Sequence, residues 1–140
     1  MTQRAFFLDT AYAYALVNKS DAWHSAAVEW QNKIVHEGVG LCTTEYVLCE
    51  IADGLSSLKF HKKTFQLISV LEESPLITVI PASTELFHKG FQLFEHYEDK
   101  EWSLTDCISF VVMRKYKLNE ALTTDIHFQQ AGFRALLREK

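Results

Sequence analysis

The sequence predicts an α/β fold, in which a short parallel sheet lies between two layers of helices as a single three-layer domain covering residues 1–140. Four short, continuous apolar runs have the pattern of strands that are buried on both faces. Longer segments with helical periodicity separate these runs, which favours right-handed crossovers between parallel strands. A chain of 140 residues with 48% hydrophobic residues, two prolines and five glycines can build one core.

The expected strands are short and regularly placed. The four apolar runs that predict them cover residues 5–8, 40–43, 76–80 and 120–123, and residues 133–137 give a weaker fifth run. Neither a repeat nor a linker interrupts this pattern. Parallel strands bring their carboxyl ends to one edge of a sheet, and ligands bind at that edge near the point where strand order reverses.

Helical patterns fill the intervals between the strands. They predict helices over residues 10–17, 21–36, 44–58, 60–73, 83–97 and 103–117, with a last turn at 127–131 that Gly132 closes. Asp21, Thr44 and Ser103 are the expected N-caps of the second, third and sixth helices. The third helix carries an apolar stripe made of Val47, Leu48, Ile51, Leu55 and Leu58.

Net charge, cysteine spacing and the length of the apolar runs limit the classes of protein to which the chain can belong. The formal net charge is −4 and the sequence pI is near 5.8, so the chain lacks the basic surface of proteins that wrap nucleic acid passively. Cys42, Cys49 and Cys107 lie in apolar runs without metal-ligand spacing, and we expect buried free thiols in a reducing cytoplasm. The longest apolar runs are too short for a membrane span, so we expect a soluble protein without membrane contact.

Two carboxylates follow predicted strands directly. Asp9 comes after the first strand, and Asp125 follows the fourth. Both also precede helical segments, where aspartate is a favoured N-cap. Sequence position alone leaves capping and a role in a site equally open for each residue.

Two further acids lie in helices. Asp106 falls in the first turn of a helix that is apolar on nearly every face, where a buried carboxylate can point into a cleft. The alternative is a capping box with Ser103. Glu50 lies at the edge of an apolar stripe, where burial is costly unless the acid is paired, and the alternative is a solvated surface glutamate.

Taken together, the four acids predict a metal site. Carboxylates that converge on one cleft repel each other and raise their own pKa values. A hard cation removes this conflict, and Mg²⁺ or Mn²⁺ prefers oxygen ligands. Such a site can lower the pKa of a water, orient it on a phosphodiester and stabilise the leaving oxygen.

Four segments resemble, in order, the successive motifs of PIN domains. They are Phe7-Leu8-Asp9-Thr10, Thr44 with Glu50 six residues later, Leu104-Thr105-Asp106-Cys107, and residues 122–128 with the sequence Leu-Thr-Thr-Asp-Ile-His-Phe. The resemblance covers essentially the whole chain. It implies a parallel sheet between helices and Mg²⁺- or Mn²⁺-dependent cleavage of single-stranded RNA. The resemblance also implies that a small VapC-like member is often the toxin of a toxin–antitoxin pair, is often a homodimer and is silenced by a protein antitoxin.

The resemblance also assigns roles to residues. It implies that the metal-binding catalytic acids are Asp9, Glu50, Asp106 and Asp125. Thr10 and Thr105 become polar supports beside them. The chain departs from the family at His127, because some members carry a further acid two residues after the last aspartate; His127 is either a group that supports the acids or a surface residue.

Substrate contacts are predicted less directly. Trp102 precedes Asp106 by one helical turn and is a candidate for stacking on a base. Lys62 and Lys63 belong to a basic stretch that can contact phosphates, although a solvated helix start is the favoured alternative. Asp99 is a candidate for the cleft mouth, although a charge run before a helix is usually solvated.

Three functions compete. The first is a PIN-type endoribonuclease, in particular the toxin of a toxin–antitoxin pair. The second is a PIN-like module that binds RNA or protein without catalysis. A phosphoacceptor receiver domain ranks well below both, because it needs a paired acid near the first strand and a lysine after the last strand. Dinucleotide-binding, Walker A and serine-hydrolase motifs do not occur in the sequence.

Overall fold

The computed structural model describes residues 4–139 and contains one five-stranded sheet. Its strands are β1 (Ala5–Leu8), β2 (Gly40–Thr44), β3 (Ile77–Ile80), β4 (Glu120–Leu122) and β5 (Arg134–Ala135). Every neighbouring pair is parallel, in the order β3-β2-β1-β4-β5. The chain therefore builds outward from β1 to β3 and then returns to the other side of β1. The predicted parallel sheet is confirmed.

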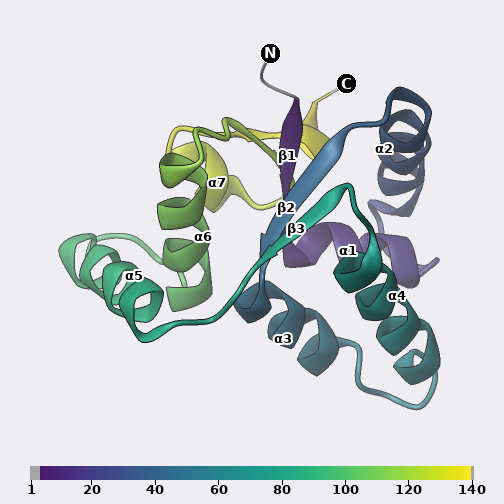
Figure 1. Cartoon of the computed structure of the whole chain (residues 1–140), viewed down its shortest axis with the longest axis horizontal. Coiled ribbons are helices and arrows are strands. Elements are labelled where there is room, and N and C mark those ends of the chain that lie inside the picture. Colours follow the sequence, from purple (N-terminus) through teal and green to yellow (C-terminus); the bar gives the residue numbers. More distant parts are fainter. Residues whose placement is uncertain (1–3, 140) are drawn as a thin grey trace.

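Helices cover both faces of this sheet. They are α1 (Thr10–Val17), α2 (His24–Glu37), α3 (Glu45–Gly54), α4 (His61–Glu73), α5 (Thr84–His96), α6 (Leu104–Lys115), α7 (Ile126–Gln130) and the 3₁₀ helix η1 (Leu136–Arg138). In Figure 1, α1, α2 and α4 lie on one side of the strands, and α5, α6 and α7 lie on the other. The predicted three-layer arrangement is confirmed.

The central strand and α6 form the middle of the core. Phe6, Phe7 and Leu8 of β1 are 2% exposed or less, as expected for a strand covered on both faces. The ring of Phe128 from α7 lies 6.4 Å from that of Phe7 and 4.9 Å from that of Phe110 in α6. This aromatic packing joins the sheet to the two helices that begin beside its carboxyl edge.

Two helices differ from their predicted bounds. The second begins at His24 rather than Asp21, because the Asp21 carboxylate accepts a hydrogen bond from the backbone of Trp23 and makes a turn before the helix. The third ends at Gly54, against which the Tyr14 ring packs so closely that a Cβ would collide with it. Leu58 then lies beyond the helix and is 98% exposed, so its predicted place in the apolar stripe is wrong.

The cysteines and the last strand give two further corrections. Cys42 and Cys107 are buried free thiols as predicted, and burial raises the pKa of each to about 11. Cys49 is exposed, because it lies on the face of α3 opposite the buried Val47. The fifth strand keeps only two residues, and the buried leucines that follow it form η1.

Candidate active site

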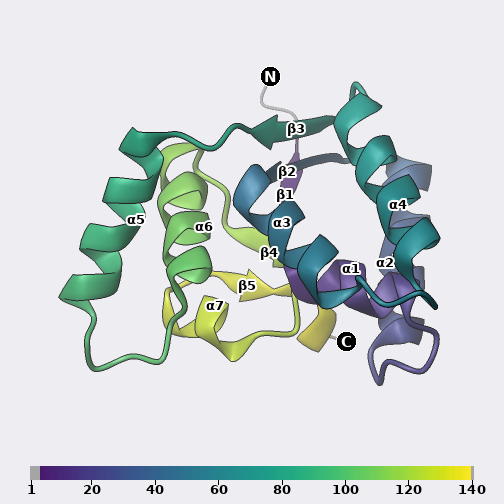
Figure 2. The same cartoon turned by 90° about the horizontal axis from the view of Figure 1, so that it is seen from below.

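Strand order reverses between β1 and β4, and the site lies where these two strands end. β1, β2 and β3 extend in one direction from the centre, whereas β4 and β5 extend in the other. Asp9 follows β1 directly, and Asp125 is the residue before α7, just beyond β4. Figure 2 views the molecule from this end, with α1, α3 and α6 grouped around the strands. A ligand site is expected at such a reversal point.

The four predicted acids line a single open pocket. Its lining residues are Asp9, Thr10, Ala11, Tyr14, Glu50, Asp106 and Asp125. The pocket has a volume of about 310 Å³, whereas one water takes up about 30 Å³ in the liquid. It therefore has room for a hydrated cation beside a phosphate group. The structure brings together acids from four separate segments of the chain.

Helix capping accounts for two of these acids, but not for Asp9. Asp125 caps α7, because its Oδ1 accepts a hydrogen bond from the His127 backbone at 2.8 Å. Asp106 forms the predicted capping box, in which its Oδ2 accepts from the Ser103 backbone at 3.2 Å. Asp9 occupies the N-cap position of α1 without a side-chain capping bond. Capping and pocket lining are compatible for Asp106 and Asp125, whereas the Asp9 carboxylate has no capping role.

Glu50 is held in place rather than solvated. The Thr10 hydroxyl donates a hydrogen bond to its Oε1, and the Tyr14 hydroxyl donates to its backbone carbonyl at 3.0 Å. Both donors come from α1, which packs against α3. Glu50 is half-buried as a result. The first helix therefore positions an acid that lies forty residues later in the chain.

The electrostatics of the pocket disfavour an all-ionised state. Asp9 is 4% exposed, and burial raises its pKa to about 7, with nearby Asp106 adding to the shift. Burial and then the charge of Asp125 raise the pKa of Asp106. Among residues 4–139, no lysine or arginine pairs with any of the four acids. The pocket is thus an acidic cluster in which the described residues offer no lysine or arginine to balance the charge of the ionised acids.

The side chains present fit a hard divalent cation. The pocket offers carboxylate oxygens, which suit Mg²⁺ and Mn²⁺. One oxygen each of Asp106 and Asp125 and one ring nitrogen of His127 lie within 4.8 Å of one another. A cation bound to the carboxylates would offset the charge repulsion from Asp125 that adds to burial in raising the pKa of Asp106.

The predicted supporting residues fall into two groups. Thr10 lines the pocket and bonds to Glu50. Thr105 is half-buried in the first turn of α6 and is not among the described residues that line the pocket. Asp99 is exposed in the loop before α6, and its carboxylate lies 3.5 Å from Lys100 Nζ. The structure therefore brings only Thr10 to the acids, and Asp99 has the solvated setting that was the favoured alternative.

The predicted substrate contacts are not at the pocket. Trp102 is only 4% exposed, its ring packs on Tyr97 and Phe110, and its Nε1 donates to Gln130. A base cannot stack on a ring that is covered in this way, so the stacking prediction for Trp102 is corrected. Lys62 and Lys63 are exposed in the first turn of α4, outside the described pocket lining.

Sequence reasoning missed one residue and left another open. Thr123 is fully buried at the end of β4, where its hydroxyl donates to Asp9 Oδ2 at 2.7 Å and accepts from the Asp125 backbone at 3.0 Å. It therefore connects the two strand-end acids. The signal was a polar residue directly after the apolar Ala121 and Leu122, two places before Asp125. His127 Nδ1 lies 3.2 Å from Asp125 and 3.3 Å from Asp106, so it is not a detached surface residue.

Comparison with known proteins gives a family and a relative. The family model described as PIN domain matches residues 6–134. The 23S rRNA-specific endonuclease VapC20 of Mycobacterium tuberculosis is 28% identical over 128 residues, which are 91% of this chain and 94% of that protein. The family resemblance predicted from the four motifs is confirmed.

Solved structures support the same fold. The crystal structure of M. tuberculosis VapC20, described as a sarcin–ricin loop cleaving toxin, matches with a TM-score of 0.80 and 25% identity, covering 93% of this chain and 97% of that one. FitAcB of Neisseria gonorrhoeae matches with a TM-score of 0.62 and 20% identity, covering 92% and 94%. VapBC2 of Rickettsia felis, bound to a DNA fragment from its promoter, matches with a TM-score of 0.67 and 14% identity, covering 93% and 96%. The last two show similarity of fold alone.

Proposed function

Because this chain belongs to the PIN domain family, we propose that it is a metal-dependent endoribonuclease that hydrolyses phosphodiester bonds in single-stranded RNA. The observation that carries the proposal is the convergence of four acids on one pocket without a lysine or arginine partner among the described residues. The VapC20 relative, named as an endonuclease of 23S rRNA, supports RNA as the substrate.

The proposal assigns metal binding to the four acids and the orientation of two of them to nearby threonines. The residues that hold Mg²⁺ or Mn²⁺ are Asp9, Glu50, Asp106 and Asp125. A bound cation supplies positive charge at the phosphate and lowers the pKa of the attacking water. Thr123 fixes the Asp9 carboxylate, and Thr10 fixes that of Glu50, so the ligands are oriented before the metal arrives. Without a cation, the acids would repel the negatively charged RNA backbone.

Cleavage of labelled RNA tests the activity. The purified chain is incubated with an RNA that contains the sarcin–ricin loop sequence and with an unrelated single strand of equal length, in Mg²⁺, Mn²⁺ or EDTA. We expect cleavage that requires metal and disappears in Asp9→Asn, while circular dichroism shows an intact fold. RNA binding without cleavage in any metal would favour the alternative of a non-catalytic PIN-like module. Cleavage that persists in EDTA would contradict the metal-dependent mechanism.

We also propose that the enzyme is the toxin of a toxin–antitoxin pair. The relative of known structure is described as a toxin and aligns over nearly the whole chain. Induced expression in a bacterial host should arrest growth, whereas expression of Asp9→Asn should not. Growth arrest by both proteins would indicate a cause other than RNA cleavage. A protein antitoxin should restore growth when it is co-expressed.

Location and assembly remain proposals of the same kind. None of the helices in residues 4–139 combines the length and the apolar character that a membrane crossing requires. We propose that the enzyme acts in the cytoplasm, where its RNA substrate is found. The homodimer that the family resemblance implies is tested by light scattering of the purified chain, in which a monomer mass at micromolar concentration would exclude it.

A further inference from the structure

His127 lies between two acids of the pocket. It is in the first turn of α7, and its Nδ1 is 3.3 Å from Asp106 Oδ2 and 3.2 Å from Asp125 Oδ1. Its side chain is 25% exposed, so it is partly shielded from solvent. His127 is not among the described residues that line the pocket. It therefore contacts the acids without forming the pocket wall.

The surroundings fix the role of the imidazole nitrogen. Both neighbours of Nδ1 are carboxylate oxygens, which accept hydrogen bonds when ionised. A hydrogen on Nδ1 lets the ring donate to Asp106 and Asp125 together, and this is the tautomer that we assign. Two carboxylates that would otherwise repel each other are joined by one donor.

In both Asp106 and Asp125, one carboxylate oxygen accepts hydrogen bonds from the protein. Asp106 Oδ2 accepts from His127 and from the Ser103 backbone. Asp125 Oδ1 lies beside the His127 ring and accepts from the His127 backbone. The second oxygen of each carboxylate has no hydrogen-bond partner among residues 4–139. Those two oxygens are the ones available to an external ligand.

We propose that His127 is a positioning residue that bridges Asp106 and Asp125 through Nδ1 and thereby keeps one oxygen of each carboxylate free for the metal. This inference rests on the proposed metal-dependent function. Partners of this kind orient ligands before binding, and their loss typically lowers metal affinity ten- to one-hundredfold. The proposed bridge also assigns a role to position 127, where some family members carry an additional acid.

The alternative role is direct coordination of the metal by His127. A nitrogen that already donates a hydrogen bond to two oxygens is not free to bind a cation at the same atom. The two roles predict different spectra for the protein loaded with Mn²⁺. A positioning residue leaves only oxygen ligands, whereas a directly bonded imidazole adds nitrogen hyperfine coupling to the electron spin echo signal.

The test measures Mn²⁺ affinity by electron paramagnetic resonance in three variants. His127→Ala removes the bridge, His127→Asn restores an N–H donor near the position of Nδ1, and His36→Ala removes an exposed histidine of α2 as a control. We expect His127→Ala to bind Mn²⁺ ten- to one-hundredfold more weakly, and the other two to stay within about threefold of wild type. Equal affinity in His127→Ala and wild type, or no recovery in folded His127→Asn, would overturn the proposal.

Two outcomes separate this inference from the proposed function. Nitrogen hyperfine coupling that is present in wild type and absent in His127→Asn would show direct coordination, which overturns the positioning role while leaving the nuclease intact. Folded wild type that binds no Mn²⁺ would instead overturn the proposed function itself. Thermal unfolding of every variant identifies any change that comes from loss of structure.

Discussion

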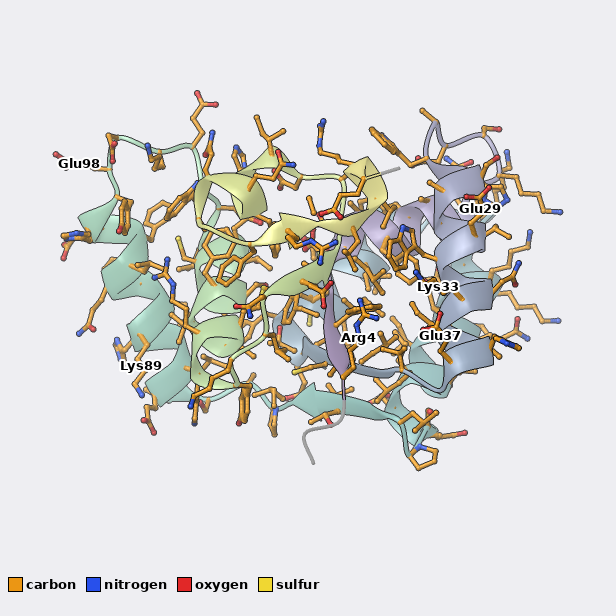
Figure 3. All side chains as sticks on the ribbon, turned by 90° about the horizontal axis from the view of Figure 1, so that it is seen from above. Arg4, Glu29, Lys33, Glu37, Lys89 and Glu98 are labelled. Carbon is orange, nitrogen blue, oxygen red and sulfur yellow. The ribbon has the colours of Figure 1, made fainter. Side chains whose placement is uncertain are left out.

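Acids at the two ends of the sheet differ in whether a lysine or arginine side chain pairs with them. At the amino end, Glu120 begins β4 and accepts hydrogen bonds from Arg4 at 3.3 Å and from Arg134 at 2.6 Å. Figure 3 views this end, with Arg4 labelled near its centre. Arg134 also pairs with Glu139 at 2.5 Å. At the carboxyl end, the four acids of the pocket have no lysine or arginine partner among the described residues.

This difference supports the proposal that the pocket acids are functional, whereas Glu120 and Glu139 are structural. The Arg134 hydrogen bond lowers the pKa of Glu139, whereas burial raises the pKa of Asp9 to about 7. At the amino end, Arg4 and Arg134 therefore balance the charges of Glu120 and Glu139. At the pocket, the described residues supply no lysine or arginine, and we propose that an external cation binds there instead. Position along the strands and charge pairing together identify the site.

Substitution of one acid at each end should give the sharpest contrast. Asp9→Asn removes a proposed metal ligand, and we expect cleavage to fall roughly a thousandfold, because a catalytic metal contributes several kcal/mol of transition-state stabilisation. Its stability should not fall, since the lost charge was buried without a cation. Glu120→Gln should keep full cleavage and lose about 1 kcal/mol of stability. Equal losses of cleavage in both variants would contradict the proposal that only the acid at the carboxyl end takes part in catalysis.

The stability of the metal-free protein should fall as pH rises. Burial raises the pKa of Asp9 in the folded state to about 7 from its ordinary value of 3.8, so between these values the folded state holds a proton that the unfolded state releases. Stability is then highest near pH 4, declines toward pH 7 and changes no further above it. The decline is at most about 4 kcal/mol. Urea unfolding in EDTA at pH 5 and pH 8 measures it, and Asp9→Asn should lack this component.

Divalent metal should stabilise the folded protein in a way that depends on the pocket. At a metal concentration one-hundredfold above the dissociation constant, stabilisation is about 2.7 kcal/mol. For a chain of 140 residues this corresponds to a melting temperature roughly 10 °C higher. Differential scanning calorimetry with Mg²⁺ or Mn²⁺ against EDTA measures the shift. Asp106→Asn should reduce it strongly, whereas an unchanged shift would place the bound metal elsewhere.

The smallest effect is expected at the exposed ion pairs of the amino end. Arg134→Ala removes contacts to Glu120 and Glu139 that are open to solvent. We expect a slightly lower melting temperature, an effect that weakens in high salt, and unchanged cleavage. A large loss of cleavage would show that the two ends of the sheet are coupled.

Much of the fold and the four acids could be predicted because local pattern and topology determine them. Continuous apolar runs identify β1 to β4, and parallel topology then places Asp9 and Asp125 at one edge. Glu50 and Asp106 follow from their positions on amphipathic or buried helices. The strands, the helices and the positions of the acids on them all follow from local patterns of apolar and polar residues in the sequence.

The errors concern side chains whose surroundings are set by packing and by helix ends rather than by spacing along the chain. Trp102 is buried because Tyr97, Phe110 and Gln130 close around it, and spacing from Asp106 carries no information about that packing. Leu58 is exposed because α3 ends at Gly54. His127 was left between two interpretations for the same reason, since its ring reaches Asp106, twenty-one residues earlier.

Anomalous diffraction from crystals soaked in Mn²⁺ tests the central claim most directly. The data are collected above the manganese absorption edge, so that the ion is located without assumption about its ligands. We predict an anomalous peak in the pocket lined by Asp9, Glu50, Asp106 and Asp125, and loss of this peak in Asp9→Asn crystals. Manganese bound only outside the pocket, or an empty pocket at saturating Mn²⁺, would contradict the assignment of these acids as a metal site.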